Sequence, residues 1–150
     1  MRNLFVGIDV SMKDFKVQFM EHLGETITKR QRFSNDNPGM ESLVQLILEI
    51  CQANDIGCVM VGLEATSMYS WHLQMGLTSD TRLTPYNCQV YSFNPKVVAN
   101  FKKAYPDLPK NDWTDAWVIA DRLRFGRLPE NSQVDFRYLP LQRLTRFRYH

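Results

Sequence analysis

Four carboxylates stand where a charged side chain is unusual. Asp9 lies inside the apolar run "NLFVGIDV" at 3–10, and Glu64 ends the apolar run "CVMVGLE". Asp112 and Asp115 open the stretch "KNDWTDAWVIADRL" at 110–123. A carboxylate that is buried alone either destabilises the fold or stays protonated. Each of the four positions therefore calls for a turn, a helix cap or a bound cation.

The pair in 110–123 has two explanations. As caps, Asp112 would be the N-cap of a helix, and Asp115 would suit the positive end of the helix dipole. The apolar stripe of this helix consists of Ala116, Ile119, Ala120 and Leu123. Asp112 and Asp115 each lie four residues before a member of this stripe, so both extend the inward face by one turn. Capping does not require that direction, whereas a metal site does.

The four acids considered together favour a metal. Each alone is explained by a turn or a cap, but Gly7 and Gly62 stand two residues before Asp9 and Glu64 and leave room beside the backbone. Four inward-facing carboxylates would repel one another unless a cation neutralised them. Mg²⁺ prefers oxygen ligands, and two ions ~3.5–4 Å apart can bind both reacting oxygens of a phosphodiester. We therefore expect a Mg²⁺ site, in which Mn²⁺ can substitute.

Hydrophobic patterning predicts the elements that position these acids. The predicted strands cover 3–10, 13–21, 25–33, 57–64 and 89–93, and the predicted helices cover 40–53, 66–77, 94–105 and 112–125. The hairpin strands come first, and the helices appear only afterwards. This order favours an α/β fold of the ribonuclease H-like class, with a mixed five-stranded sheet and helices on both faces.

The chain becomes basic toward its C-terminus. Residues 96–150 hold eleven Lys and Arg against six Asp and Glu, although the whole chain carries only +2. Lysines and aromatic residues are interleaved before the acidic pair: Lys96, Phe101, Lys102, Lys103, Tyr105, Lys110 and Trp113. Lysines can neutralise phosphates and aromatic rings can stack on unpaired bases, so the pattern predicts nucleic-acid binding. A solvated helix face above core aromatics is the alternative.

The remaining features set the domain organisation. A chain of 150 residues fits one domain, here expected over 1–126, with a linker and the start of a truncated coiled-coil helix over 127–150. No apolar run approaches the ~18 residues of a membrane span. Three cysteines without a CxxC pair suggest structural thiols in a reducing compartment, and the N-terminus does not resemble a signal peptide. A cytoplasmic protein is expected.

Four segments resemble one known family in their order and spacing: "VGIDVSMKDF", "GLEATSMYSW", "FNPKVVANF" and "KNDWTDAWVIADRL". They are similar to the N-terminal domain of the insertion-sequence transposases with a DEDD signature, the one-hundred-and-ten family. That family is related to the pilin-gene invertases and is described as bridge-RNA-guided recombinases. The resemblance covers about 4–125 and continues weakly into 141–150. It implies that Asp9, Glu64, Asp112 and Asp115 are the DEDD acids of a RuvC-like, magnesium-binding domain.

Smaller motifs also match that family. Thr66 and Tyr69 resemble the threonine and tyrosine that follow the glutamate, and Asn94 with Pro95 resembles the pair before the basic helix. Two positions depart from the family pattern. Ser67 stands where glycine is usual, which questions whether that backbone needs a positive φ. Asn111 stands where threonine is usual, although asparagine can also cap a helix.

The resemblance implies a composite active site in a bacterial or archaeal cytoplasm. In that family a coiled coil and a second domain with a nucleophilic serine follow, both expected beyond residue 150, so strand exchange by this segment alone is not expected. DNA and a guide RNA are both bound there, by dimers or tetramers. The guide RNA and the serine nucleophile are thus expectations from the family and not from the residues.

Three other functions remain open. A stand-alone junction-resolving nuclease would use the same acids with water as nucleophile. A non-catalytic nucleic-acid-binding module would use them only as caps and turns. A sugar-kinase or actin-like ATPase lobe also opens with "GID", but Ser11 and Met12 stand where its backbone would hold phosphate, and no second glycine-rich loop follows.

Overall fold

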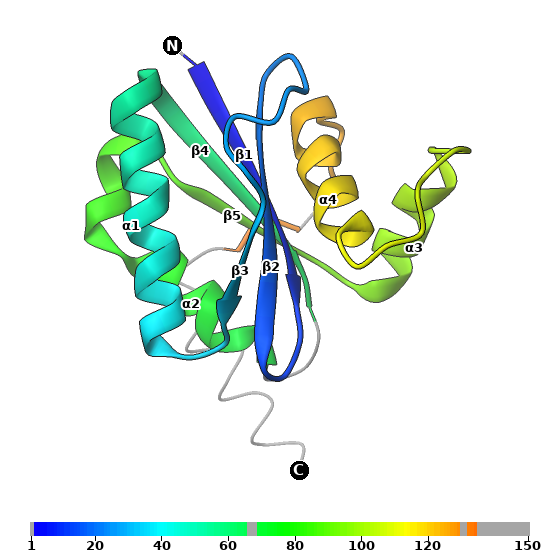
Figure 1. Ribbon diagram of the computed structural model, residues 1–150, viewed down its shortest axis with the longest axis horizontal. Coiled ribbons are helices and arrows are strands. Elements are labelled where there is room, and N and C mark those ends of the chain that lie inside the picture. The colour runs from blue at the N-terminus through cyan, green and yellow to red at the C-terminus, as the bar shows by residue number, and fades with distance from the viewer. Residues whose placement is uncertain (1, 66–68, 130–131, 135–150) are drawn as a thin grey trace.

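A mixed five-stranded sheet forms the centre of the molecule in a computed structural model, which describes residues 2–65, 69–129 and 132–134 (Figure 1). The strand order is β3-β2-β1-β4-β5. The strands are β1 (Arg2–Val10), β2 (Asp14–Glu21), β3 (Gln31–Ser34), β4 (Ile56–Glu64) and β5 (Gln89–Phe93). β1 pairs antiparallel with β2 and parallel with β4, and β4 pairs parallel with β5. The predicted mixed sheet is confirmed.

The central strand β1 is covered on both faces, which explains why its sequence is apolar almost throughout. Its alternate side chains belong to two separate cores. Leu4, Val6, Ile8 and Val10 belong to the larger core, whereas Phe5 belongs to the smaller core on the opposite face. Asp9 follows Phe5 by four residues and so points to the side of the smaller core.

Helices cover both faces of the sheet, as Figure 1 shows. α1 (Asn37–Asn54) and α2 (Trp71–Ser79) lie on one side, and α3 (Pro95–Lys103) and α4 (Thr114–Phe125) lie on the other. α1 begins at Asn37, before the predicted start at 40, because the Asp36 carboxylate caps it by accepting a hydrogen bond of 2.8 Å from the backbone N–H of Gly39. In the described residues no helix is long and apolar enough to span a membrane.

The predicted strand over 25–33 is mostly wrong. β3 begins only at Gln31, and of the earlier part Thr26 forms one isolated bridge to Met20. Ile27 still packs against the larger core and its N–H donates a 3.3 Å hydrogen bond to the Phe19 carbonyl, but the polar residues 28–30 belong to no strand. Gly24 lies in the turn that follows β2 and has a φ of +86°.

The region after β4 also differs from the prediction. The helix expected over 66–77 is observed as Trp71–Ser79, and residues 66–68 lie outside the described residues. A short 3-10 helix, η2 (Thr81–Tyr86), follows and was not predicted. It begins where the Asp80 side chain accepts a hydrogen bond from the Arg82 N–H, and Pro85 lies within it. Capping chemistry and a proline, not hydrophobic periodicity, define this element.

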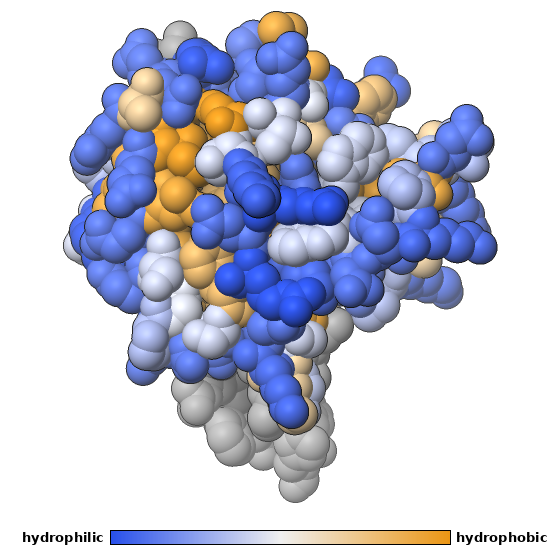
Figure 2. Space-filling view, in the orientation of Figure 1, coloured by the Kyte–Doolittle hydropathy of each residue, from blue (hydrophilic) through white to orange (hydrophobic). Residues whose placement is uncertain are grey.

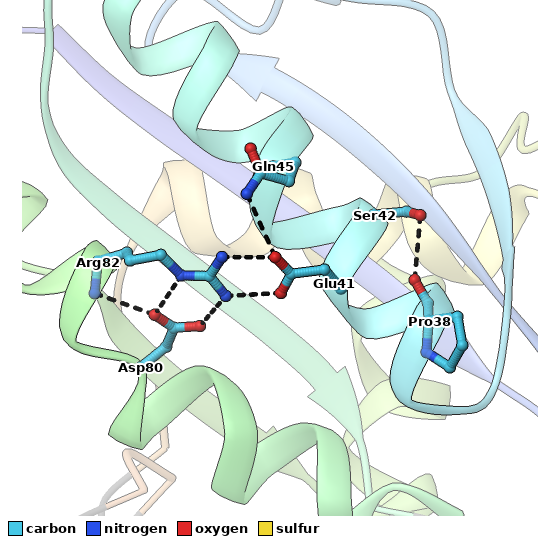
Figure 3. Close-up of polar contacts among 6 residues, drawn as sticks. All are labelled: Pro38, Glu41, Ser42, Gln45, Asp80 and Arg82. Carbon is cyan, nitrogen blue, oxygen red and sulfur yellow. Dashed lines mark hydrogen bonds and ion pairs between the residues drawn. The ribbon is translucent and has the colours of Figure 1, made fainter.

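An exposed arginine ties η2 to α1 (Figure 3). The guanidinium of Arg82 donates two hydrogen bonds to Glu41, of 2.6 and 2.7 Å, and also contacts Asp80. These bonds, with one from Gln45, lower the pKa of Glu41 to about 2. The paired geometry is the bidentate form that arginine makes with carboxylates.

The segment after α4 runs along the free edge of the sheet. Gln133 forms an antiparallel bridge with Tyr91 of β5. Ser92 N–H donates to the Ser132 carbonyl at 2.8 Å, and Val134 N–H donates to the Val90 carbonyl at 2.7 Å. The predicted boundary at 126 and the predicted helix start at 141–150 stay predictions, because 135–150 lies outside the described residues.

Candidate active site

Asp9 and Glu64 stand at neighbouring ends of two parallel strands. The register pairs Gly7 with Gly62 and Ile8 with Leu63, so the next position places Asp9 beside Glu64. Both side chains follow the glycines by two residues and therefore lie on the α4 side of the sheet. Carboxyl ends of parallel strands are a common location for ligand sites in α/β sheets.

Two glycines allow α4 to lie directly on these strands. A Cβ atom on Gly7 would stand 2.1 Å from the Ala116 carbonyl oxygen and 2.6 Å from the Ala120 nitrogen. A Cβ on Gly62 would stand 2.8 Å from the Ile119 side chain. The sequence predicts that something approaches the backbone at these positions, and that element is α4. Its first turn, with Asp115, is thereby held against the ends of β1 and β4.

The three acids form one electrostatic cluster. Burial raises the pKa of Asp9, and the nearby charge of Asp115 raises it further. The pKa of Glu64 is also raised, first by burial and then by the charges of Asp115 and Asp9. The charge of Asp115 on α4 thus disfavours the ionisation of Asp9 on β1 and of Glu64 on β4, as the sequence predicts for inward-facing acids.

Two lysines already offset part of this charge. Lys102 of α3 places its Nζ 2.5 Å from Asp115 Oδ1, with the two side chains 42% and 30% exposed. Lys16 is the antiparallel partner of Asp9 in the β1–β2 ladder, and its charge lowers the pKa of Asp9. Lys16 is absent from the sequence-based site. The alternation of β2 together with the short hairpin could have placed it there.

Asp112 occupies a different position from the one predicted. α4 begins at Thr114, so Asp112 precedes the helix and does not extend its buried stripe. The side chain that accepts the 2.8 Å hydrogen bond from the Trp113 N–H belongs to Asn111, not to Asp112. Asp112 is exposed and is not among the charges that raise the pKa of Asp9 or Glu64. The capping role considered for it is therefore wrong.

Asp112 nevertheless borders the same open hollow as the cluster. This hollow, the acidic hollow, has a volume of about 730 Å³. Its charged lining residues are Asp9, Lys16, Lys102, Lys110, Asp112 and Asp115. The structure thus brings Asp9, Glu64 and Asp115 close enough for their charges to interact, and Asp112 lines the hollow with Asp9 and Asp115, whereas Glu64 is not among its lining residues.

The predicted nucleic-acid-binding residues separate into two groups. Lys102 and Lys110 line the acidic hollow, whereas Lys96 and Lys103 are not among its lining residues. Phe101 is 6% exposed and packs in the smaller core, so its ring cannot stack on a base. Tyr105 and Trp113 remain partly accessible. The alternative, in which the aromatic rings belong to the core, thus holds for Phe101, one of the three rings.

The family motif residues have structural roles where they are described. The Asn94 side chain caps α3 by accepting a 2.9 Å hydrogen bond from the Val97 N–H, and Pro95 is the first helical residue. Tyr69 is 41% exposed, and its carbonyl accepts a hydrogen bond from Asn35. Thr66 and Ser67 lie outside the described residues.

The cluster suits a hard divalent cation by its chemistry. All its donors are carboxylate oxygens, and the raised pKa values of Asp9 and Glu64 and the contact of Lys102 with Asp115 indicate that positive charge is favoured there. Within 2–65, 69–129 and 132–134, however, no three Asp, Glu, His or Cys side chains already stand as a metal-binding group. Metal binding would thus require these side chains to turn toward one another and Lys102 to move from Asp115.

The sheet order, the helices on both faces and the acids at the ends of β1 and β4 define a RuvC-like domain of the ribonuclease H-like class. Among solved structures, the chain is similar to T. thermophilus RuvC in complex with a Holliday junction substrate. The TM-score is 0.57 at 13% sequence identity, over 89% of this chain and 99% of that chain. This likeness confirms the predicted fold class.

The family follows from the sequence comparison. A family profile described as a transposase, the DEDD type of IS110, matches residues 6–150. The chain therefore belongs to the IS110 family of DEDD transposases, and its RuvC-like fold is that of a catalytic domain. No curated protein matches the chain.

Proposed function

We propose that this domain supplies the metal-dependent part of a transposase active site. Asp9, Glu64 and Asp115 would hold Mg²⁺, or Mn²⁺ in its place. Asp112, in the turn before α4, would complete the ligand set. The observation that carries this proposal is the position of Asp9 and Glu64 at neighbouring strand ends beside α4, where burial and then the charge of Asp115 raise the pKa of both carboxyls. Crowded carboxylates that disfavour their own ionisation favour binding of a divalent cation.

The residues around the acidic hollow would have separate tasks. A divalent cation bound there supplies charge stabilisation for a reacting phosphodiester. The strand ends fix Asp9 and Glu64, and the docking of α4 on Gly7 fixes Asp115. Lys16, Lys102 and Lys110 would contact flanking phosphates. Lys102 would exchange its present contact with Asp115 for a phosphate contact once the cation is bound.

The wider assignment rests on the family. We propose that the domain acts on DNA under the direction of a guide RNA and within a dimer or tetramer. A serine on a second domain would be the nucleophile, so cutting and rejoining of DNA requires that domain in addition. A bacterial or archaeal cytoplasm is the corresponding location.

A second candidate is a hydrolytic junction nuclease in which water replaces the serine. The similarity to RuvC in complex with a Holliday junction substrate favours this reading over other enzymes. The two candidates differ in an assay of the isolated chain with Mg²⁺ and a four-way DNA junction. Specific cutting by the chain alone would support the hydrolytic nuclease, whereas cutting only with the serine domain present would support the transposase.

Metal binding is tested first without any nucleic acid. Mn²⁺ or Mg²⁺ at a hundred times its Kd should stabilise the chain by about 2.7 kcal/mol, which corresponds to roughly 5–10 °C in Tm. Asp9→Asn should abolish this shift. Glu49→Gln is the matched control, because Glu49 is exposed on α1 at the opposite face and should leave the shift intact. No metal response between pH 6 and 9 would favour a non-catalytic binding module.

A further inference from the structure

A second cavity lies beside the acidic hollow. It has a volume of about 450 Å³, within the range of pockets that hold small organic molecules, roughly 300–1,000 Å³. The loop 104–113 between α3 and α4 forms much of its wall, and the first residues of α4 form another part. The cavity, here called the aromatic pocket, includes three aromatic side chains: Tyr105, Trp113 and Trp117.

The aromatic walls are held in place by contacts of their own. Tyr105 and Trp117 meet edge to face, with ring centroids 5.4 Å apart and planes at 79°. The Tyr105 hydroxyl donates a 2.5 Å hydrogen bond to Asp121, which Arg124 also binds. These contacts fix the ring orientation before any ligand arrives, so little conformational entropy remains to be lost on binding.

The guanidinium of Arg30 lies over the third aromatic ring, that of Trp113. Arg30, from the segment before β3, places its Cζ 4.9 Å from the centroid of the Trp113 ring. Guanidinium groups in such contacts also stack on bases and bind phosphates. The aromatic pocket therefore joins flat apolar surfaces to a cation, which is the combination that binds one nucleotide of a single strand.

The aromatic pocket and the acidic hollow share a wall. Tyr105, Leu108, Asn111 and Thr114 line both cavities. On the hollow side, Lys16, Lys102 and Lys110 provide positive charge next to the acids. A strand with a phosphate in the acidic hollow is thus adjacent to an apolar, aromatic cavity, which suits the base of the same or the next nucleotide. A paired base would first have to be flipped out of its stack, which costs a few kcal/mol, so the cavity would favour an unpaired base.

We propose that the aromatic pocket binds a single unpaired nucleobase of the nucleic-acid strand that lies in the acidic hollow, with Trp113 as the stacking surface. This inference deepens the proposed function, on which it rests for the identity of the ligand. It assigns to the domain a preference for strands that are unpaired next to the reacting phosphate.

The test compares oligonucleotides with and without one base. Binding of single-stranded DNA with 2-aminopurine at one position, or with an abasic site there, is measured in EDTA, and an RNA pair is measured in parallel. We expect 2-aminopurine fluorescence to be quenched on binding and the abasic strand to bind about 5- to 100-fold more weakly. Trp113→Leu should lower the affinity for the base-bearing strand by a similar factor and leave the abasic strand unchanged. The arm that responds shows whether DNA or RNA supplies the base.

The controls keep the result interpretable. Phe125→Leu removes another aromatic ring with an arginine beside it, at 5.1 Å and outside the aromatic pocket, and should not alter base dependence. Trp113→Phe should restore most of the base dependence if Trp113→Leu loses it by loss of stacking and not by misfolding. Equal affinity of base-bearing and abasic strands, or an equal loss for both in Trp113→Leu, would overturn the proposal.

The assay also separates this inference from the metal site. Because EDTA is present, base-dependent binding is measured without a bound metal, and Glu49→Gln, on the opposite face, should retain it. A chain without any metal response but with base-dependent binding would refute the proposed metal role and support the aromatic pocket. A metal response without base-dependent binding would support the proposed metal role and refute the aromatic pocket.

Discussion

Replacing Gly7 with alanine tests whether α4 docking builds the active site. The added Cβ would stand 2.1 Å from the Ala116 carbonyl oxygen, whereas real Cβ contacts essentially never fall under 3.0 Å. The helix backbone must therefore retreat by about 0.9 Å, the difference between these two distances. Overpacking of this kind costs about 1–3 kcal/mol, and a clash with backbone belongs at the upper end because no side chain can rotate away.

The expected result has two parts. The Tm should fall by roughly 5–10 °C, since each kcal/mol corresponds to about 2–4 °C in a domain of this size. Asp115 adjoins Ala116 and should move with it by nearly the same distance. Metal sites tolerate errors of about 0.2 Å, so the Mn²⁺-induced rise in Tm should largely disappear in Gly7→Ala. Thermal unfolding with and without Mn²⁺ measures both effects.

Gly76→Ala is the matched control. Its added Cβ would meet only the flexible side chain of Met40, at 2.3 Å from the sulfur, and alanine is favoured over glycine in helix α2. This variant should be as stable as the parent and keep its metal response. The reasoning fails if Gly7→Ala retains the parental Tm to within a degree, or if it is destabilised but responds fully to Mn²⁺.

Three further outcomes are expected. Lys102→Met removes the cation beside Asp115, so the affinity of this variant for Mn²⁺, measured by calorimetry, should rise by up to about five-fold. That factor corresponds to the free energy of a partly exposed ion pair. A weaker affinity would contradict competition between lysine and metal. Because the folded-state pKa values of Asp9 and Glu64 are raised, their ionisation destabilises the metal-free protein above the unfolded pKa. Asp9→Asn should therefore raise the Tm at pH 8, and this gain should shrink as the pH falls through the raised pKa; a gain that stays equally large below the ordinary aspartate pKa of about 3.9 would refute it. Arg82→Met removes the tie between η2 and α1, so its Tm should be lower and less sensitive to salt than that of the parent.

Patterning in the sequence was sufficient for β1, β2, β4 and β5 and for two of the acids, but not for the start of β3. The alternation in β1 and β4 placed Asp9 and Glu64 on one face, because side chains in a strand alternate strictly. The stripe in α4 likewise gave the direction of Asp115. The prediction extended this apolar stripe too far toward the N-terminus, to Asp112. The residues after Pro109 instead form a turn, in which the Asn111 side chain accepts a hydrogen bond from the Trp113 N–H, and α4 begins only after it.

Other parts of the site depend on tertiary contacts that no local pattern contains. The pairing of Lys102 with Asp115 arises from the packing of α3 on α4, which are separated by a loop. The contact of Arg30 with Trp113 joins residues far apart in the sequence. Such contacts follow from helix docking over Gly7, and a glycine in a strand indicates only that something approaches.

The antiparallel pairing of Gln133 with Tyr91 bears on how copies of this chain can associate. Exposed sheet edges are natural sites for strand addition between molecules, yet the backbone groups of Val90 and Ser92 are already bonded to residues 132–134. Assembly by edge-to-edge strand exchange at β5 would first have to peel this segment away. Within the described residues, the surfaces left for a dimer or tetramer that keeps this pairing are helices, loops and the short outer strand β3.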